Sequence, residues 1–427
     1  MSLRIQPKQL QGKVHIPPSK SMAHRAIICA SLARGRSIIS NVQYSKDIEA
    51  TISAMKALGT MIFQHDDYLE IDGTTTFMRN NGEIGCHESG STLRFIIPIS
   101  LVQPSNFHFK GEGRLGKRPL DVYYQIFEKQ NIGYLYKENV LDLYVMGQLH
   151  AGTFEIAGDV SSQFISGLLF ALPLLPQDSR IIITSPLQSK GYVDLTIQML
   201  QHYGVFVINN EYQELIIPGG QHYHARDYEV EGDFSQAAFY LVAGALGNDV
   251  ILEGLNFQSK QGDKVAIDIL KKMGCQFYQE EDSCRITCAS LQGTTIDGTQ
   301  CPDIIPVVAM ACANAKGKSV IKNVERLRLK ECDRLKATVD MIQQLGGQVI
   351  ENQDSMEIIG VKKLKGGQVT SSHDHRMAMS AAIVSSVCED VVVLDDYECV
   401  EKSYPDFWKD FKSLGGEYSE CELGNDN

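Results

Sequence analysis

The 427-residue sequence contains no apolar run long enough to cross a bilayer, which argues against a membrane-spanning chain. The first eleven residues are polar, so they do not read as a secretory signal. Eleven cysteines occur without the paired spacing of a zinc site or the density of a small secreted framework. We therefore expect buried or free thiols, neither a metal nor a cofactor, and a cytoplasmic protein.

An excess of positive charge is lacking as well, because 52 acidic residues outnumber 40 Lys and Arg and give a net charge of −12. This balance argues against broad nucleic-acid binding. A local cluster of cations is then more informative, because it opposes the overall field. The length suits two or three domains, and a hydrophobic content of 43% is typical of a soluble globular protein.

The most informative single stretch is residues 17–25, which read PPSKSMAHR. Two prolines favour a turn, Ser19 is a candidate N-cap, and a small-residue apolar run follows as far as Gly35. Lys20 should then lie in the first turn of a helix and Arg25 about one turn further on. Cations at a helix N-terminus are unfavourable unless an anion binds there, although a solvated basic helix start is an equally simple interpretation.

The same design, a polar or Gly-rich turn followed by a small-residue apolar helix, recurs at intervals of about 70 residues, as in an internally repeated architecture. The expected helices lie in the segments Pro18–Ala33, Glu88–Val102, Asp159–Leu174, Asp233–Ala245, Asp303–Ala315 and His373–Val387. Second helices are expected at Ile48–Leu58, Val122–Gln130, Leu195–Tyr203, Val265–Met273 and Thr338–Leu345. Short β-like runs lie between them, for example Thr153–Ile156, Val205–Ile208 and Val391–Leu394. Each repeat is thus predicted to be a βαβαββ unit, with three units in each of two domains.

Several of the helix starts carry side chains that suit anion recognition. Glu88–Arg94 includes Gly90, which permits close backbone approach, and Gly111–Pro119 is a shaped basic loop in which Arg118 precedes a proline. Hydroxyl and amide groups are supplied by Ser161, Ser162 and Gln163, and by the loop Ser189–Tyr192. The simplest alternative is that these groups only cap helices.

Asp303 follows a proline at the fifth helix start, where an ordinary N-cap is the simplest interpretation. Downstream, residues 326–334 place four cations beside two acids. If this stretch is helical, Lys330 and Arg334 share one face and need an anion, whereas a solvated salt-bridge helix is the alternative. Glu331 beside them could relay a proton.

Taken together, these motifs resemble the EPSP synthase (3-phosphoshikimate 1-carboxyvinyltransferase) branch of the enolpyruvyltransferase family. The matching stretches cover nearly the whole chain: residues 18–25, 114–119, 161–164, 330–334 and 374–379. The resemblance implies an α/β fold of two domains, each an inside-out barrel of three βαβαββ units, with the active site in the cleft between them. It implies a discontinuous first domain of residues 1–16 and 230–427, and a second domain of residues 17–229.

The resemblance also implies a reaction, transfer of the enolpyruvyl group of phosphoenolpyruvate to the 5-hydroxyl of shikimate 3-phosphate with release of phosphate. By this resemblance the catalytic residues are Asp303, Glu331 and Lys20. Those that hold shikimate 3-phosphate are Lys20, Ser21, Arg25, Ser161, Ser162, Gln163, Ser189, Tyr192, Asp303, Arg326 and Lys330. Those that hold phosphoenolpyruvate are Lys20, Gly90, Arg118, Gln163, Arg334, Arg376 and Lys402.

One departure is Arg326, which stands where the family often has Asn. The resemblance further implies a monomer and inhibition by glyphosate, an anionic competitor for the phosphoenolpyruvate pocket. Two alternatives remain at this point. A UDP-N-acetylglucosamine enolpyruvyltransferase shares fold and donor but typically carries a reactive Cys in the loop that corresponds to Gly111–Pro119, which has none here. A non-catalytic phosphometabolite-binding protein would need the cations but not Asp303 and Glu331.

Overall fold

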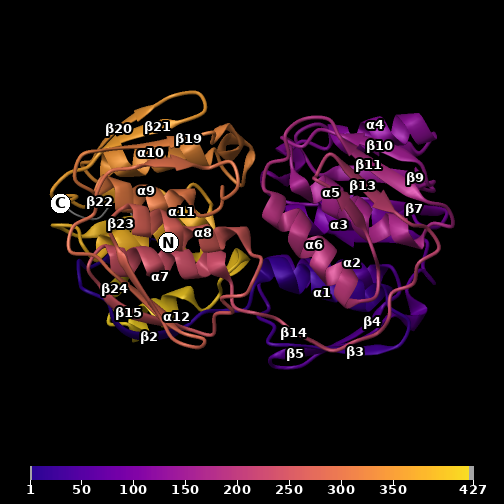
Figure 1. Ribbon diagram of the computed structural model, residues 1–427, viewed down its shortest axis with the longest axis horizontal. Coiled ribbons are helices and arrows are strands. Elements are labelled where there is room, and N and C mark those ends of the chain that lie inside the picture. The colour runs from indigo at the N-terminus through magenta and orange to yellow at the C-terminus, as the bar shows by residue number, and fades with distance from the viewer. Residues whose placement is uncertain (1, 423–427) are drawn as a thin grey trace. The chain divides into compact units, whose positions relative to one another are not determined.

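The computed structural model describes residues 2–422. The chain divides into two units, one formed by Met1–Pro17 together with Gly232–Asn427 (unit 1) and one formed by Pro18–Glu231 (unit 2) (Figure 1). The boundaries expected from the resemblance lie one residue before the first of these division points and two residues before the second.

Within residues 2–422, the strands form six four-stranded sheets that share one pattern. In each sheet one pair of neighbouring strands at an edge is parallel and the other two neighbouring pairs are antiparallel, as in β6-β7-β9-β8. A helix connects the parallel strands where they are consecutive in the chain, because a parallel pair needs a crossover. This arrangement confirms the predicted βαβαββ repeat.

Unit 2 holds three of the sheets among its described residues, β14-β3-β5-β4, β6-β7-β9-β8 and β10-β11-β13-β12. Its helices are α1 (Lys20–Leu32), α2 (Lys46–Ala57), α3 (Gly90–Ser100), α4 (Asp121–Gln130), α5 (Ser162–Ala171) and α6 (Lys190–His202). Its strands are β3 (Arg36–Ser40), β4 (Met61–Gln64), β5 (Tyr68–Asp72), β6 (Asn81–Gly85), β7 (Ser105–Lys110), β8 (Gly133–Tyr136), β9 (Asp142–Gly147), β10 (Thr153–Ile156), β11 (Ser179–Ile183), β12 (Ile208–Asn210), β13 (Glu214–Ile217) and β14 (Tyr228–Glu229).

Unit 1 holds the sheets β22-β23-β1-β24, β16-β17-β15-β2 and β18-β19-β21-β20. Its helices are α7 (Phe234–Ala245), α8 (Val265–Lys272), α9 (Ile305–Ala313), α10 (Arg334–Gln344), α11 (His375–Ser385) and α12 (Phe407–Ser413), with 3₁₀ helices η4 (Gly262–Lys264), η5 (Glu325–Leu329) and η6 (Tyr397–Lys402). Its strands are β1 (Ser2–Ile5), β2 (Gln11–His15), β15 (Asp249–Glu253), β16 (Gln276–Gln279), β17 (Cys284–Thr287), β18 (Thr295–Asp297), β19 (Lys318–Lys322), β20 (Gln348–Glu351), β21 (Met356–Ile359), β22 (Gly367–Val369), β23 (Val392–Asp395) and β24 (Tyr418–Cys421).

Two strands show how the repeat continues where the chain passes from one unit to the other. β2 pairs in parallel with β15 of unit 1, although the chain runs from β2 into α1 of unit 2. β14 pairs in parallel with β3 of unit 2, beside which it lies in Figure 1, although the chain runs from β14 into α7 of unit 1. Each strand therefore supplies the first strand of a repeat whose helices come from a distant part of the sequence.

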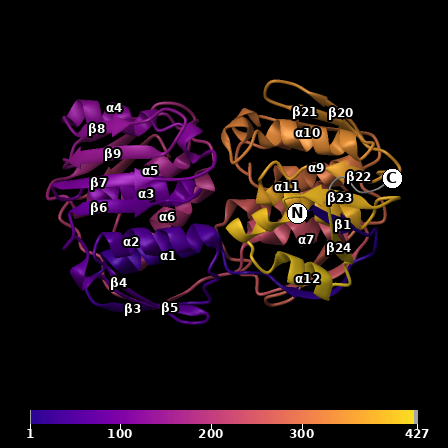
Figure 2. The ribbon, with the colours of Figure 1, turned by 180° about the vertical axis from the view of Figure 1, so that it is seen from behind.

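The first helix of each repeat forms the core, as the small-residue pattern predicts. Every residue of α7, α9 and α11 is buried, and these three helices contact one another within unit 1 (Figure 2). In unit 2, α3 packs on α5, where a Cβ added at Gly167 would lie 2.2 Å from the carbonyl oxygen of Arg94. A helix that is apolar on all sides belongs inside a domain, which is where these three helices lie.

The predicted helices are confirmed, with some local corrections. α12 was not predicted, and the strand expected at Val205–Ile208 begins only at Ile208, because the amide of Val205 donates to the carbonyl of Leu200 at the end of α6. Helix α1 ends at Leu32, before Gly35. Lys330 lies outside a helix, since α10 begins at Arg334. The chain is helical from Lys190 onward, where a loop was expected.

Candidate active site

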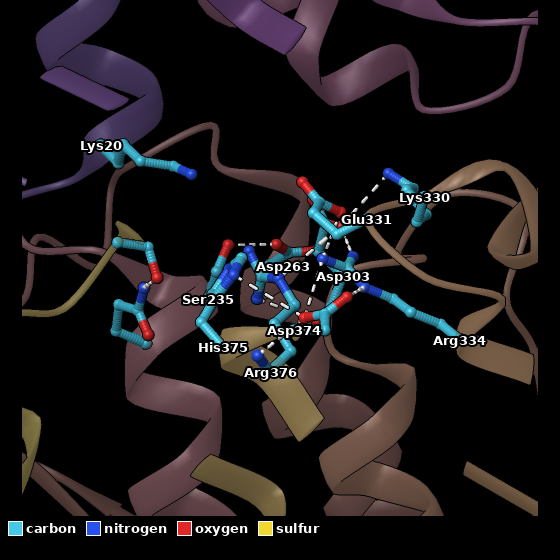
Figure 3. A network of polar contacts seen from close by, with 12 residues as sticks. Lys20, Ser235, Asp263, Asp303, Lys330, Glu331, Arg334, Asp374, His375 and Arg376 are labelled. Atoms are coloured by element: carbon cyan, nitrogen blue, oxygen red, sulfur yellow. Dashed lines mark hydrogen bonds and ion pairs between the residues drawn. The ribbon is translucent and has the colours of Figure 1, made fainter. Parts of the chain in front are cut away.

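Asp303 lies just before α9, yet it is not the N-cap of that helix. The N-cap is Ile304, and no side chain caps the helix start. The carboxylate of Asp303 instead accepts hydrogen bonds from Nζ of Lys330 at 3.2 Å and from Nη1 of Arg334 at 2.8 Å (Figure 3). The simple capping interpretation of this aspartate is therefore wrong, and its carboxylate is directed at cations.

The electrostatic setting keeps Asp303 ionised. Burial by itself would raise the pKa of this carboxyl, but the charges of Lys330, Arg376 and Arg334 together outweigh burial and hold the pKa well below its usual range. Arg376 contributes from α11, because its Nη1 donates to the backbone oxygen of Asp303 at 2.9 Å and its Nε lies 3.8 Å from the carboxylate. The result is an ionised acceptor surrounded by donors.

Arg334, the first residue of α10, connects this carboxylate to two others. Its side chain is only 1% exposed. Nε donates to Asp374 at 2.6 Å and Nη2 donates to Glu331 at 2.6 Å, in addition to the bond from Nη1 to Asp303. A buried guanidinium is tolerated only when its donors are satisfied, so Asp303, Glu331 and Asp374 hold Arg334 in one orientation.

Lys330 and Arg326 approach the same group from the segment around η5. Burial, followed by the charges of Arg334 and Arg326, lowers the pKa of Lys330 to about 8, although Asp303 acts in the opposite direction. Lys330 is therefore close to losing its proton at slightly alkaline pH. The sequence predicted that Lys330 and Arg334 share one helix face. They do not, yet both contact Asp303.

Lys402 is buried at the end of η6, which packs against α11, the helix that carries Arg376. Arg376 itself is buried in the first turn of α11, whose N-cap Asp374 accepts a hydrogen bond from its amide at 2.9 Å. In unit 1 the predicted residues Asp303, Lys330, Glu331, Arg334 and Arg376 thus form one connected network, and Lys402 lies on the 3₁₀ helix that packs against α11.

In unit 2 the first helix start behaves as predicted. Ser19 caps α1, and Lys20 occupies the first helical position, where its Nζ forms an ion pair with Asp47 at 2.7 Å. Asp47 is buried in the first turn of α2. The carboxylate offsets the unfavourable placement of a cation at a helix N-terminus and fixes the direction of the ammonium group.

Arg25 ties the start of α1 to the start of α6. Its Nη1 donates to the carbonyl of Ser21 at 2.7 Å, its Nη2 to the carbonyl of Tyr192 at 2.9 Å and its Nε to Oγ1 of Thr196 at 2.9 Å. Burial lowers the pKa of Arg25 to about 10. Ser189, which precedes α6 with a left-handed φ of 56°, is buried next to this contact. Ser21, Arg25, Ser189 and Tyr192 therefore lie together.

Gln163 makes the corresponding connection between α5 and α3. Its Nε2 donates to Oγ of Ser91 at 2.9 Å, and its Oε1 accepts from Nη1 of Arg94 at 2.7 Å. Ser161 is the N-cap of α5 and accepts from the amide of Gln163, whereas Ser162 is buried in the first turn. Capping therefore accounts for one of the two serines, and the side-chain amide of Gln163 is held by Ser91 and Arg94.

Gly90 lies against the guanidinium of Arg118. A Cβ added at Gly90 would lie 2.6 Å from Nη1 and 2.8 Å from Cζ of Arg118. Because that spacing is shorter than any normal carbon contact, the guanidinium can occupy this place only if residue 90 is glycine. The loop Gly111–Pro119 is thereby brought to the first turn of α3, and two residues predicted for the same ligand are neighbours.

Three buried residues that hold the site were not singled out from the sequence. They are Arg94, which also donates from Nη2 to the carbonyl of Pro119 at 3.0 Å, Asp47 beside Lys20, and Asp374 beside Arg334. A charged residue inside an apolar helix was the available signal for Arg94, and an acid at a helix start for the other two. Over residues 2–422, no group of His, Cys, Asp and Glu side chains could hold a metal ion.

The cations, hydroxyl groups and carboxylates described above can bind anionic groups and exchange protons with them. Comparisons with known proteins show which family this chain is similar to. A sequence model of the family EPSP synthase (3-phosphoshikimate 1-carboxyvinyltransferase) matches residues 5–411. Proteins named 3-phosphoshikimate 1-carboxyvinyltransferase are similar along nearly their whole length: one from Clostridium botulinum is 51% identical (99% of each chain covered), and one from Clostridium perfringens is 53% identical (96% of this chain, 98% of the relative).

Solved structures share the fold. An EPSP synthase from Acinetobacter baumannii superimposes with a TM-score of 0.82 at 24% identity, covering 98% of this chain and all of the other. The enolpyruvyl transferase NikO from Streptomyces tendae gives a TM-score of 0.80 at 14% identity, with 98% of each chain covered. No helix within residues 2–422 is long and apolar enough to cross a membrane.

Proposed function

The chain belongs to the EPSP synthase (3-phosphoshikimate 1-carboxyvinyltransferase) family, and we propose how its own residues divide the work of that reaction. The activity is transfer of the enolpyruvyl group of phosphoenolpyruvate to the 5-hydroxyl of shikimate 3-phosphate, with release of inorganic phosphate. The reaction needs cations for two phosphates and two carboxylates, an acid for the methylene carbon and a base for the hydroxyl.

The observation that supports this assignment best is the carboxylate of Asp303, which is held ionised between Lys330 and Arg334. We assign to Asp303 the role of base that accepts the proton of the 5-hydroxyl as the oxygen attacks C2 of phosphoenolpyruvate. A merely binding protein would gain little from a buried carboxylate among the cations that must receive anions.

The methylene carbon must gain a proton in the same step, and we assign that proton to Glu331, with Lys20 as the second candidate donor. Glu331 accepts from Arg334, which in turn holds Asp303, so an acid and a base lie on either side of one guanidinium. In the elimination step a proton leaves the new methyl group, the C–O bond to phosphate breaks, and the enol ether forms. The same pair can serve this reverse transfer.

For shikimate 3-phosphate, unit 2 supplies Ser21, Arg25, Ser161, Ser162, Gln163, Ser189 and Tyr192, and unit 1 supplies Arg326, Lys330 and Asp303. Arg25 and Gln163 hold the helix starts of α1, α3, α5 and α6 to their neighbours, which directs amide and hydroxyl donors at a phosphate. This preorganisation reduces the ordering that binding would otherwise require.

For phosphoenolpyruvate, we assign Lys20, Gly90, Arg118 and Gln163 of unit 2 and Arg334, Arg376 and Lys402 of unit 1. Gly90 admits the guanidinium of Arg118. A guanidinium carries five N–H donors, so Arg334 can hold its carboxylates and still offer a donor to the substrate. A binding site in a cleft between the units stays a prediction, as do a monomeric state, a cytoplasmic location and inhibition by glyphosate through these same cations.

The direct test is phosphate release from phosphoenolpyruvate by the full-length protein with either acceptor. We expect release with shikimate 3-phosphate and none with UDP-N-acetylglucosamine, whose enzymes typically use a loop cysteine that Gly111–Pro119 lacks. Release with the UDP-sugar alone would support the related transferase. Tight binding of shikimate 3-phosphate without release would support the non-catalytic alternative.

A further inference from the structure

Cys275 immediately precedes β16 and Cys288 immediately follows β17, at the open end of this antiparallel pair. The antiparallel register pairs Gln276 with Thr287 and Phe277 with Ile286, so one further step along the same ladder places Cys275 opposite Cys288. Burial and, after it, the nearby Cys288 thiol raise the pKa of the Cys275 thiol, so the two side chains lie close to each other. Directly opposed residues in antiparallel strands have Cα atoms about 4.5–5.5 Å apart, which is within the range that a disulfide accepts.

The backbone on both sides of this pair is held in place. The amide of Cys275 donates to the carbonyl of Leu270 at the end of α8, at 3.1 Å. Beyond Cys288, the amide of Gln292 donates to the carbonyl of Met273 at 2.9 Å. These hydrogen bonds fix the backbone before β16 and after β17, next to both cysteines.

The two thiols differ in accessibility, which gives the pair a direction of reaction. Cys275 is 8% exposed and burial raises the pKa of its thiol, whereas Cys288 is half-buried and can be reached by a small reagent. Cys284 belongs to the same hairpin and is buried too, but the register places it opposite Gln279, so it has no cysteine across the strand.

We propose that Cys275 and Cys288 are a site of oxidative modification, where a cross-strand disulfide closes the β16–β17 hairpin. The co-reactant is a low-molecular-weight disulfide. The thiolate of Cys288 attacks one of its sulfurs and releases one small thiolate, which leaves a mixed disulfide on Cys288. The thiolate of Cys275 then attacks the Cys288 sulfur and releases the second small thiol. Two protein thiols are oxidised, and the small disulfide is reduced to two thiols.

The test is to incubate the full-length protein with oxidised glutathione, block the remaining thiols with an alkylating reagent, digest, and map the cysteines by mass spectrometry. We expect a peptide pair joined through Cys275 and Cys288, two hydrogens lighter than the separate peptides and separable by dithiothreitol. If both cysteines are still alkylated, or if Cys288 joins a different cysteine while Cys275 stays reduced, the proposal is overturned.

Two variants sharpen the result. Cys288→Ser should abolish the linked pair and leave Cys275 reduced, whereas Cys284→Ser, a change of a buried thiol in the same hairpin, should leave the link intact. In wild-type protein the oxidised form should unfold at a higher denaturant concentration than the reduced form, since a disulfide restricts the unfolded chain. Loss of the link in Cys284→Ser but not in Cys288→Ser would contradict the assignment.

Discussion

The guanidinium of Arg334 donates to the carboxylate of Asp374 from Nε at 2.6 Å and from Nη2 at 3.3 Å, with the side chain of Asp374 fully buried. The same carboxylate caps α11 by accepting from the amide of Arg376. One aspartate therefore positions two cations that belong to different helices. Its contribution is to geometry, since a buried charge pair holds its members in place even where its net contribution to stability is small.

Asp374→Ala should destabilise the protein by about 3–5 kcal/mol. The substitution removes a carboxylate that accepts hydrogen bonds from the buried guanidinium of Arg334, and it removes the N-cap of α11. Urea unfolding of the variant and the wild type measures this loss. The matched control is Asp340→Ala, which breaks the solvent-exposed pair with Lys336 on α10 and should change the stability little. Equal losses of stability in the two variants would show that the buried pair contributes no more to stability than the exposed pair.

Lys330 should give the reaction an alkaline limit. With a pKa of about 8, below its ordinary value of 10.5, Lys330 is cationic at lower pH and loses its charge as the pH rises through about 8. Above that pH, kcat/KM for shikimate 3-phosphate should decrease, with a limiting slope of about tenfold per pH unit. In Lys330→Arg the guanidinium keeps its charge, so this limb should disappear from the pH profile. A limb that persists unchanged in the variant belongs to another group.

Gly90→Ala should displace the guanidinium of Arg118, because the added Cβ would lie 2.6 Å from Nη1. We expect kcat/KM for phosphoenolpyruvate to fall by about ten- to a hundredfold, as small displacements of substrate-holding groups do, and inhibition by glyphosate to weaken. Steady-state kinetics measure both. The control is Gly85→Ala, where nothing lies within 4 Å of the added Cβ. Normal kinetics in Gly90→Ala would show that the position of the Arg118 guanidinium is not needed for binding phosphoenolpyruvate.

Arg94→Lys tests whether Arg94 acts through Gln163. A lysine cannot reach both the Gln163 amide and the Pro119 carbonyl in the geometry that the guanidinium spans. KM for phosphoenolpyruvate should rise about tenfold, and adding Gln163→Ala should cost less in the Arg94→Lys variant than in wild type. Arg180→Lys, at the exposed pair with Glu214, serves as the control. Strictly additive effects would mean that the two residues act separately.

The helix starts could be predicted from the sequence because their signals are local. Ser19, which caps α1, lies directly before Lys20, and a run of small apolar residues marks each buried helix. The repeat could be predicted for the same reason, although α12 was missed because its aromatic-rich, charged sequence does not resemble the small-residue helices.

The pairings inside the site could not be predicted in this way. Arg94 and Gln163 are 69 residues apart, and Lys20 and Asp47 are 27 apart, so only the packing of α3 on α5 and of α1 on α2 brings them together. Asp303 illustrates the opposite error. Its position suggested a helix cap, but the cations that donate hydrogen bonds to its carboxylate lie 27 and 31 residues further along the chain.

Asp303→Asn tests the central claim most directly, because it removes the basic carboxylate while keeping the size of the side chain. In a single-turnover reaction with both substrates, the account predicts a rate of phosphate release lower by about 10²–10⁴-fold. It also predicts an affinity for shikimate 3-phosphate within a few-fold of the wild type. The control is Asp297→Asn, at an exposed aspartate on the nearby strand β18, which should react normally. An undiminished single-turnover rate in Asp303→Asn would contradict the assignment of the base.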